Sequence, residues 1–302
     1  MSPRSLAFGA LLASGLLLSV ELASVGLKTP LSSSLVPTFR LLGEPLQALD
    51  RLAGRVLPID ELDELELGLL LRERYEAQAN PYDLEFRYVN ELLGEIARGA
   101  SRPFEYRAYV AEGYTANAFA LPGGTIVVTR GLLRTLHSEA ELAAVLAHEL
   151  AHVELGHCFS AVKLELLARM ADQATLGRLA DLGYALLLRH AFSKAQEDEA
   201  DQYAYTWMEH GPYDPRGQAR AFDSLLAYAK SQGEVRSVGA DPLRDYVRSH
   251  PPLELRRAEF LERAKAWWRR HRGEARYVGR SNLARRRSLP SGAITASEWV
   301  RS

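Results

Sequence analysis

The chain has 302 residues, of which 47% are hydrophobic and 25% charged, and its formal net charge is −1. This composition excludes a disordered or collagen-like chain, and the balanced charge argues against a nucleic-acid partner. The single cysteine, Cys158, excludes an intramolecular disulfide and zinc sites with two or more thiolates, so any metal must rely mainly on nitrogen and oxygen ligands.

The amino terminus has the pattern of an export signal. Arg4 precedes an apolar run over residues 6–20, and Glu21 ends this run short of the roughly twenty residues that a transmembrane helix needs. We therefore expect residues 1–25 to be a signal peptide, or else a membrane anchor that the mature chain retains. Residues 26–58 contain four prolines and a run of serines, which predicts a linker.

The segment after the linker predicts two helices followed by a small sheet. A helical pattern rich in leucine and acidic residues stops at Asn80-Pro81. Further on, apolar and polar residues alternate, which is the period of a strand with one buried face. Pro122-Gly123-Gly124 predicts a turn between two strands. The expected elements are helices over residues 60–79 and 83–97, then strands over 104–110, 117–121 and 125–129.

The second half of the chain is expected to be mainly helical. Ser138, with Glu141 three residues later, forms a capping-box pattern at the start of a helix that should end near Leu155. Residues 256–287 contain twelve Lys or Arg against three Glu, so this end is basic; it forms either a solvated face or a contact with anionic lipid or cell-envelope polymer. Other helices are expected over 159–192, 195–210 and 215–230, and a loop over 231–240.

The sequence His148-Glu149-Leu150-Ala151-His152 is an H-E-x-x-H motif. On a helix, two histidines four residues apart lie on one face and can both reach one Zn²⁺. From Leu142 to Val153 every residue is apolar except His148, Glu149 and His152, and burying these three without partners would cost several kcal/mol. The motif therefore predicts a metal site, rather than core side chains held by ordinary hydrogen bonds.

A catalytic zinc needs a third protein ligand and one open position. Glu197 is the candidate ligand, because it falls on the apolar stripe of the helix expected over 195–210. Asp201 shares this face and could accept a hydrogen bond from the free ring nitrogen of a ligand histidine. Asp198 and Glu199 are expected to be solvated.

A ligand set of three histidines is not supported. The extended pattern H-E-x-x-H-x-x-G-x-x-H requires glycine at position 155 and histidine at position 158, where this chain has Leu155 and Cys158. We expect His157 to lie behind the ligands or to face solvent, and Cys158 to be a small buried apolar residue.

Four ordered blocks resemble a known family. The blocks are Asn117 to Gly124 (N-A-F-A-L-P-G-G), the H-E-x-x-H motif, Glu197 to Asp201 (E-x-x-x-D), and Ser249 to Arg256 (S-H-P-x-x-x-x-R). They resemble the zinc metallopeptidases that include the CaaX prenyl proteases, HtpX and the periplasmic BepA-like enzymes. The chain lacks the extra transmembrane spans of HtpX and the prenyl proteases, which favours the soluble periplasmic branch. It also lacks a recognisable helical-repeat domain after residue 262.

This resemblance implies an α+β fold and a zinc site. A mainly helical metallopeptidase domain, residues 59–265, would carry a small β-sheet that lines the active-site cleft, and residues 266–302 would form a basic tail. One Zn²⁺ per chain would be held by His148, His152 and Glu197, with Glu149 as the catalytic base. The residues expected behind the ligands or on the substrate are Asp201, His250, Asn117 and Arg256.

The expected activity is zinc-dependent endopeptidase cleavage of unfolded or misassembled cell-envelope proteins, in the periplasm or at a membrane that faces it. The metal would lower the pKa of water toward about 7, and Glu149 would move its proton to the leaving amine. An extended polypeptide could pair with the sheet edge. The amino-terminal segment or the basic tail could contact a membrane. An alternative stays open: a zinc-containing chaperone-like or binding module whose proteolysis is latent, closed by His250 or by residues 231–240.

Overall fold

The computed structural model describes four parts of the chain, namely residues 61–160, 192–231, 250 and 253–301. The expected signal or anchor and the expected linker lie outside the described residues, as do most of the helix expected over 159–192 and of the loop expected over 231–240. Among the described residues, no helix has the length and apolar character needed to span a membrane.

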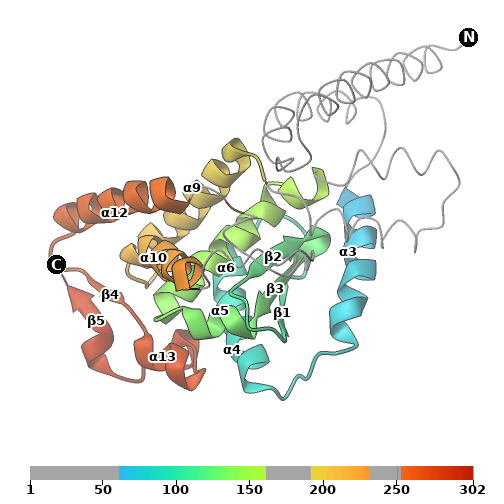
Figure 1. Ribbon diagram of the computed structural model, residues 1–302, viewed down its shortest axis with the longest axis horizontal. Coiled ribbons are helices and arrows are strands. Elements are labelled where there is room, and N and C mark those ends of the chain that lie inside the picture. The colour runs from blue at the N-terminus through green and yellow to red at the C-terminus, as the bar shows by residue number, and fades with distance from the viewer. Residues whose placement is uncertain (1–60, 161–191, 232–249, 251–252, 302) are drawn as a thin grey trace, which may run out of the picture. The chain divides into compact units, whose positions relative to one another are not determined.

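A three-stranded sheet forms the middle layer of the described fold (Figure 1). Its strands are β1 (Arg107–Ala111), β2 (Ala118–Leu121) and β3 (Thr125–Thr129). β3 is the central strand and runs parallel to β1 and antiparallel to β2, so Ile126 pairs with Ala108 on one side and with Ala120 on the other. The expected small sheet is therefore confirmed, and β1 and β2 are its two edges.

Helices cover both faces of this sheet. On one face, Ile126 and Val128 of β3 pack with α4 (Leu84–Ile96) and α6 (Glu139–Glu154) in the main core. On the other face, Val127 packs with Leu67 and Leu71 of α3 (Glu61–Glu76). The expectation that only one face of the first strand is buried was therefore wrong. Because α3 covers the second face, Tyr109 is also buried.

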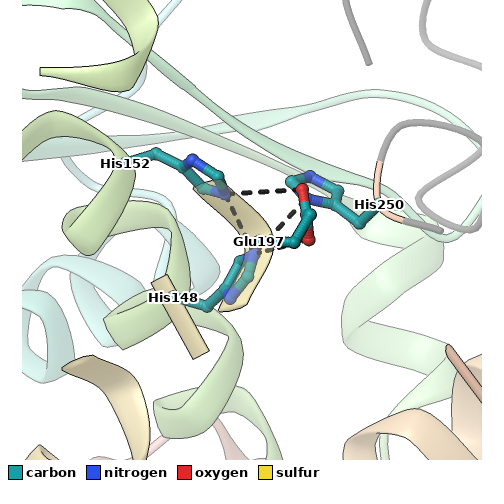
Figure 2. A group of neighbouring side chains, drawn as sticks. All are labelled: His148, His152, Glu197 and His250. Atoms are coloured by element: carbon teal, nitrogen blue, oxygen red, sulfur yellow. Dashed lines mark hydrogen bonds and ion pairs between the residues drawn. The ribbon is translucent and has the colours of Figure 1, made fainter. Parts of the chain in front are cut away.

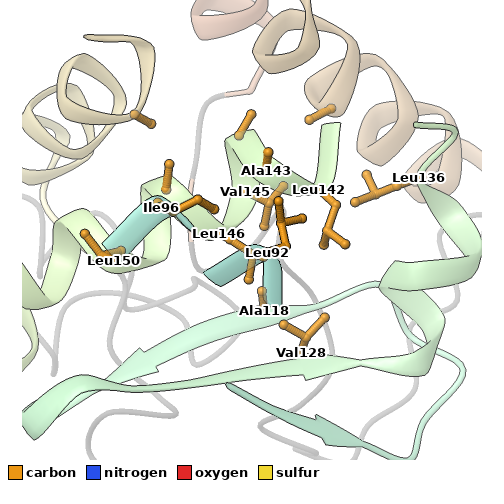
Figure 3. Packing of buried hydrophobic residues seen from close by; sticks show 14 of the residues in the cluster. Leu92, Ile96, Ala118, Val128, Leu136, Leu142, Ala143, Val145, Leu146 and Leu150 are labelled. Atoms are coloured by element: carbon orange, nitrogen blue, oxygen red, sulfur yellow. The ribbon is translucent and has the colours of Figure 1, made fainter. Parts of the chain in front are cut away.

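α6 lies at the centre of the helical layer, and every residue from Glu139 to Val153 is buried. Its start is fixed as predicted, since the Ser138 side chain accepts a hydrogen bond from the backbone N–H of Glu141. Figure 3 shows Leu142, Leu146 and Leu150 of α6 among the residues that pack over the sheet. The helix expected over 138–155 is thus confirmed, and its lack of a polar face reflects burial on all sides.

The remaining helices surround α6. α6 packs against α9 and α10, and α10 packs against α12. The expected fold class, α+β with mainly helical content, is confirmed. The other helices are α5 (Arg130–Thr135), α9 (Lys194–His210), α10 (Arg216–Ser231), α12 (Leu253–Arg270) and α13 (Arg280–Arg285). Short 3₁₀ turns occupy Ala97–Gly99, Pro122–Gly124, Leu289–Ser291 and Ala296–Glu298.

The basic carboxyl end is folded where the structure describes it. α12 continues to Arg270, and the next segment forms a two-stranded sheet from β4 (Ala275–Tyr277) and β5 (Trp299–Arg301). The backbone carbonyl of Gly279 accepts a hydrogen bond from the N–H of Glu139 at the start of α6. These residues therefore pack against the start of α6, and their expected contact with lipid stays a prediction.

Candidate metal centre

Side chains from α6, from α9 and from the residue shortly before α12 point toward one another (Figure 2). His148 and His152 lie one turn apart on α6, and Glu197 lies in the first turn of α9. Together with His250 they form a buried cluster, in which one ligand atom of each residue lies within 4.8 Å of those of the others. The structure thus brings the three predicted ligands together and adds His250 to them.

The start of α9 is what aims Glu197 at α6. The Ser193 side chain accepts a hydrogen bond from the backbone N–H of Gln196, and the Gln196 side chain accepts one from the backbone N–H of Ser193. This reciprocal capping box fixes the first helical turn. Glu197, Ala200 and Asp201 consequently lie on the buried face, as the apolar stripe predicted.

The spacing of the four ligand atoms fits a tetrahedral cation. His148 Nε2 lies 3.0 Å from His152 Nε2 and 3.3 Å from His250 Nδ1, and His250 Nδ1 lies 2.8 Å from Glu197 Oε1. Zinc–nitrogen bonds of about 2.0–2.1 Å in a tetrahedral site would separate ligand atoms by about 3.3 Å. Imidazole nitrogens and a carboxylate are also ligands that suit zinc. The residues present therefore fit a divalent metal.

Glu149 is completely buried beside this cluster. Among the described residues, neither of its carboxylate oxygens accepts a hydrogen bond, and Oε1 lies 3.6 Å from Nε2 of His250. Burial raises the pKa of Glu149, while the neighbouring His250 and His148 act in the opposite direction. A buried carboxyl group with no hydrogen bond is costly in a purely structural role, which indicates a group that serves a water molecule or a substrate.

Asp201 and Arg256 form a second layer behind the cluster. Asp201 Oδ1 lies 3.0 Å from His148 Nδ1, the ring nitrogen on the side away from Glu197. Arg256 donates to both Asp201 oxygens, through Nε at 2.6 Å and Nη2 at 2.7 Å. Its Nη1 donates to the His250 carbonyl at 2.8 Å and lies 2.6 Å from Glu197 Oε2. These contacts orient His148 and fix the two carboxylates.

The charges of the cluster determine how it is protonated. Burial lowers the pKa of His148, but Asp201 and Glu197 more than offset this effect and raise it to about 9. Burial favours the neutral form of Glu197, yet His250 and His148 hold its pKa well below the usual value. Burial and the neighbouring His148 lower the pKa of His152. A divalent cation would find Glu197 ionised here and would have to displace one proton from His148.

Two residues outside the predicted ligand set also lie beside the cluster. His157 is buried, with its Nδ1 3.0 Å from His152 Nδ1 and its Nε2 3.0 Å from Glu199 Oε2. The expectation that Glu199 is simply solvated was therefore incomplete, because its side chain is 62% exposed and still reaches His157. In the sequence, only the position of His157, five residues after His152, indicated that its side chain could reach the cluster.

Asn117 is the predicted site residue that the structure does not connect to the cluster. It lies directly before β2, where its backbone N–H donates to Thr129 Oγ1. Within the described parts of the chain, no hydrogen bond or ion pair joins Asn117 to the four clustered residues, so its predicted contact with substrate stays a prediction.

Cys158 is a buried free cysteine, and its Sγ–H donates to the carbonyl of Ala120 at 3.5 Å.

Comparison with known proteins places this geometry in a family. Residues 83–264, which are more than half of the chain and include all four clustered residues, match the peptidase family M48. The chain is 33% identical over 152 residues to the mitochondrial metalloendopeptidase OMA1 of Arabidopsis thaliana, covering 49% of this chain and 29% of that protein. It is 33% identical over 148 residues to the metalloprotease LoiP of Escherichia coli strain K12, covering 45% of this chain and 56% of LoiP.

A longer alignment reaches a third relative. The chain is 27% identical over 236 residues to the beta-barrel assembly-enhancing protease of Yersinia pestis, covering 70% of this chain and 46% of that protein. The chain thus spans from less than a third to little more than half of the length of these relatives.

Proposed function

The chain belongs to peptidase family M48, and on this premise we propose that it is a zinc-dependent endopeptidase that cleaves unfolded or misassembled proteins of the cell envelope. One observation carries the proposal. His148, His152 and Glu197 converge beside the buried carboxylate of Glu149, which accepts no hydrogen bond from the described residues. The first three would hold one Zn²⁺ per chain, and Glu149 would be the catalytic base.

When bound, the zinc ion supplies Lewis acidity, which polarises a peptide carbonyl and makes water more acidic. Glu149 accepts the proton of the attacking water at its carboxylate and returns it to the leaving amine. Burial raises the pKa of Glu149 above that of an ordinary carboxyl group, which makes it a stronger base. Asp201 keeps the ring proton of His148 on Nδ1, and Arg256 holds Asp201 and Glu197 in place.

The sheet supports an extended polypeptide as the substrate. β2 is an edge strand, and it packs against α6, the helix that carries His148 and Glu149. A polypeptide that adds to an edge strand is bound through its backbone, which gives affinity with little demand on its sequence. This mode of binding favours unfolded protein, and Asn117, next to β2, would contact the added chain.

The proposed location is the periplasm or a membrane that faces it. The apolar run over residues 6–20 has the length of a signal peptide. The similar protein of Yersinia pestis is named for beta-barrel assembly, which supports substrates in the cell envelope. Cell fractionation, with the mass of the mature chain, separates a cleaved signal from a retained anchor and tests whether the basic end binds membranes.

The substitution Glu149→Gln tests the proposed base. The variant keeps the ligand set, so we expect it to bind one equivalent of zinc and to lose cleavage of casein by about 10²–10⁴-fold, because proton transfer is removed. Zinc content and casein cleavage, each with and without a chelator, check this. His148→Ala is the control that should lose both metal and activity. Casein cleavage at the wild-type rate by Glu149→Gln would contradict the assignment.

A second candidate function is a zinc-containing chaperone-like or binding module whose proteolysis is latent. The observation that favours it is the place of His250, whose Nδ1 lies as close to His148 and Glu197 as a fourth metal ligand would. A fourth protein ligand leaves no open position for water. Equal envelope phenotypes of the wild type and Glu149→Gln would favour this module, whereas a phenotype only in the variant would favour the endopeptidase.

A further inference from the structure

His157 contacts the ring nitrogen of His152 that does not face the other clustered residues. Each histidine that binds a metal through Nε2 carries its proton on Nδ1, and the hydrogen bond made by that proton fixes the ring. For His148 the partner is Asp201. For His152 the contact on Nδ1 is the Nδ1 of His157, at 3.0 Å. Two imidazole nitrogens at this distance hold one proton between them, so His157 must accept it with an unprotonated Nδ1.

Glu199 determines which nitrogen of His157 is unprotonated. A neutral imidazole carries one proton, and a hydrogen bond to a carboxylate holds that proton on the nitrogen nearest to it. His157 Nε2 lies 3.0 Å from Glu199 Oε2, so the proton sits on Nε2 and Nδ1 is left as an acceptor. The stacking of Phe192 on the ring of His152, with centroids 3.8 Å apart and an interplanar angle of 18°, holds that ring against rotation.

We propose that His157 and Glu199 are positioning residues for the metal, which act through His152 by fixing its ring proton on Nδ1 and thereby presenting Nε2 to Zn²⁺. The order of contacts is Glu199, His157, His152 and then the metal. This inference rests on the proposed ligand set and extends it outward to the surface, where Glu199 is exposed. His148 has an acidic partner of its own in Asp201, so each ligand histidine is backed by a carboxylate, directly or through one imidazole.

The experiment measures zinc affinity in the full-length chain by competition with a chromophoric chelator, and the melting temperature of the metal-free protein. Glu199→Ala removes the acceptor of the His157 proton, and we expect the Kd for Zn²⁺ to rise about tenfold, the lower end of the effect of outer partners of metal ligands. Asp198→Ala is the matched control. Asp198 is the preceding exposed acid of α9 and pairs with Lys194. It should leave the Kd unchanged.

Substitutions at His157 separate positioning from packing. His157→Asn keeps an acceptor where Nδ1 lies, whereas His157→Leu fills a similar space with none. We expect His157→Leu to raise the Kd by about 10–100-fold and His157→Asn to recover most of that loss. In the His157→Asn background, Glu199→Ala should have no further effect, because an amide oxygen needs no partner to stay an acceptor. If His157 had only a structural role, both substitutions would lower the melting temperature, and His157→Asn would not recover the zinc affinity that His157→Leu loses.

The outcomes also distinguish this inference from the proposed function. If the wild type binds no zinc, or if His152→Ala binds zinc as tightly as the wild type, the ligand set itself fails. If the wild type and His152→Ala behave as expected but Glu199→Ala and Asp198→Ala bind zinc equally well, the positioning role alone is overturned. Glu199 is exposed, so its variants are expected to fold even if substitutions at the buried His157 do not.

Discussion

The guanidinium of Arg256 contacts two buried carboxylates at once. It lies within 2.7 Å of both oxygens of Asp201 and 2.6 Å from Glu197 Oε2, and its own side chain is 5% exposed. Two negatively charged carboxylates that share a buried site repel each other, and a cation between them offsets this repulsion. Together with His148, Arg256 therefore stabilises the ionised form of Asp201, and it adds a second cation beside Glu197.

Removing this cation should destabilise the metal-free protein. We expect Arg256→Met to lower the free energy of unfolding by about 3–5 kcal/mol, the usual effect of leaving buried charges without a partner. Urea denaturation of the chelator-treated protein measures it. Arg257→Met is the matched control, because Arg257 pairs with Asp223 at the surface, where both side chains are more than a third exposed, and surface pairs contribute about 0–1 kcal/mol. Equal losses in the two variants would contradict the role of Arg256.

At this scale the sequence predicted which side chains converge, and it predicted Asp201 behind His148, but it did not predict the contact behind His152. His148, His152 and Glu197 could be predicted because a motif and an apolar stripe place them on the buried faces of two helices. The contact between His157 and Glu199 could not, since the two residues are 42 positions apart in the chain and meet only because the residues that follow α6 lie beside the start of α9. An exposed acid near a helix start is ordinarily solvated, and only the fold shows what lies beside it.

Among the elements, α3 shows a close approach that depends on one glycine. Gly68 lies in the middle of α3, where glycine costs a helix about 0.5–1 kcal/mol relative to alanine. A Cβ atom on Gly68 would lie 2.5 Å from the carbonyl oxygen of Pro122 and 2.7 Å from Cα of Gly123. Gly123 has φ +74°, in the left-handed region that favours glycine. The helix thus packs backbone to backbone on the turn between β2 and β3.

We expect Gly68→Ala to destabilise the protein by about 1–3 kcal/mol, because the added methyl group overpacks this contact and separates α3 from the sheet. Urea denaturation measures the change. Gly94 offers a matched control in α4, since it is exposed and a Cβ atom there meets no other atom within 4 Å. Gly94→Ala should therefore stabilise the protein by about 0.5–1 kcal/mol. If both substitutions raised the free energy of unfolding, the close approach of Gly68 to the turn would not limit the side chain at this position.

The same packing explains which elements could be predicted. α6 was predicted almost to the residue, because its capping pattern and its apolar run are both local. The first strand was predicted to begin three residues too early and to end one residue too early, and its second face was predicted to be exposed. Alternation indicates a strand, but it does not indicate that a helix as distant as α3 covers Tyr109. Tyr75 and Phe86, whose rings pack near that of Tyr109, come from α3 and α4.

At the scale of the whole molecule, the carboxyl end and α6 are joined through Glu139. Glu139 is the first residue of α6 and is fully buried. Its Oε1 accepts hydrogen bonds from the Tyr213 hydroxyl at 2.7 Å and from the Leu289 N–H at 2.8 Å. Arg286, from the same carboxyl-terminal segment, pairs with Glu85 of α4. The net basic charge of this segment predicted none of these contacts, because they depend on single acidic partners elsewhere in the chain.

Glu139 should make the stability of the folded chain depend on pH. Burial raises the pKa of Glu139 to about 7 from a usual 4.5, although hydrogen bonds from Tyr213 and Leu289 lower it. The folded state therefore binds more protons than the unfolded state between these pH values. The stabilising contribution of the neutral form is complete below about pH 4.5 and is lost as the pH rises to about 7.

Glu139→Gln keeps the shape of the neutral carboxyl group and removes its titration. Relative to the wild type, we expect the free energy of unfolding of the variant to rise by about 2 kcal/mol between pH 5.5 and pH 8, as 1.36 kcal/mol per pKa unit implies over that window. Urea denaturation at the two pH values measures this difference. Glu66→Gln, at an exposed position of α3, controls for the loss of one negative charge. A pH-independent difference between Glu139→Gln and the wild type would show that Glu139 is ionised throughout this range. The junction between α6 and the carboxyl-terminal segment would then hold a buried charge, compensated by the Tyr213 and Leu289 hydrogen bonds.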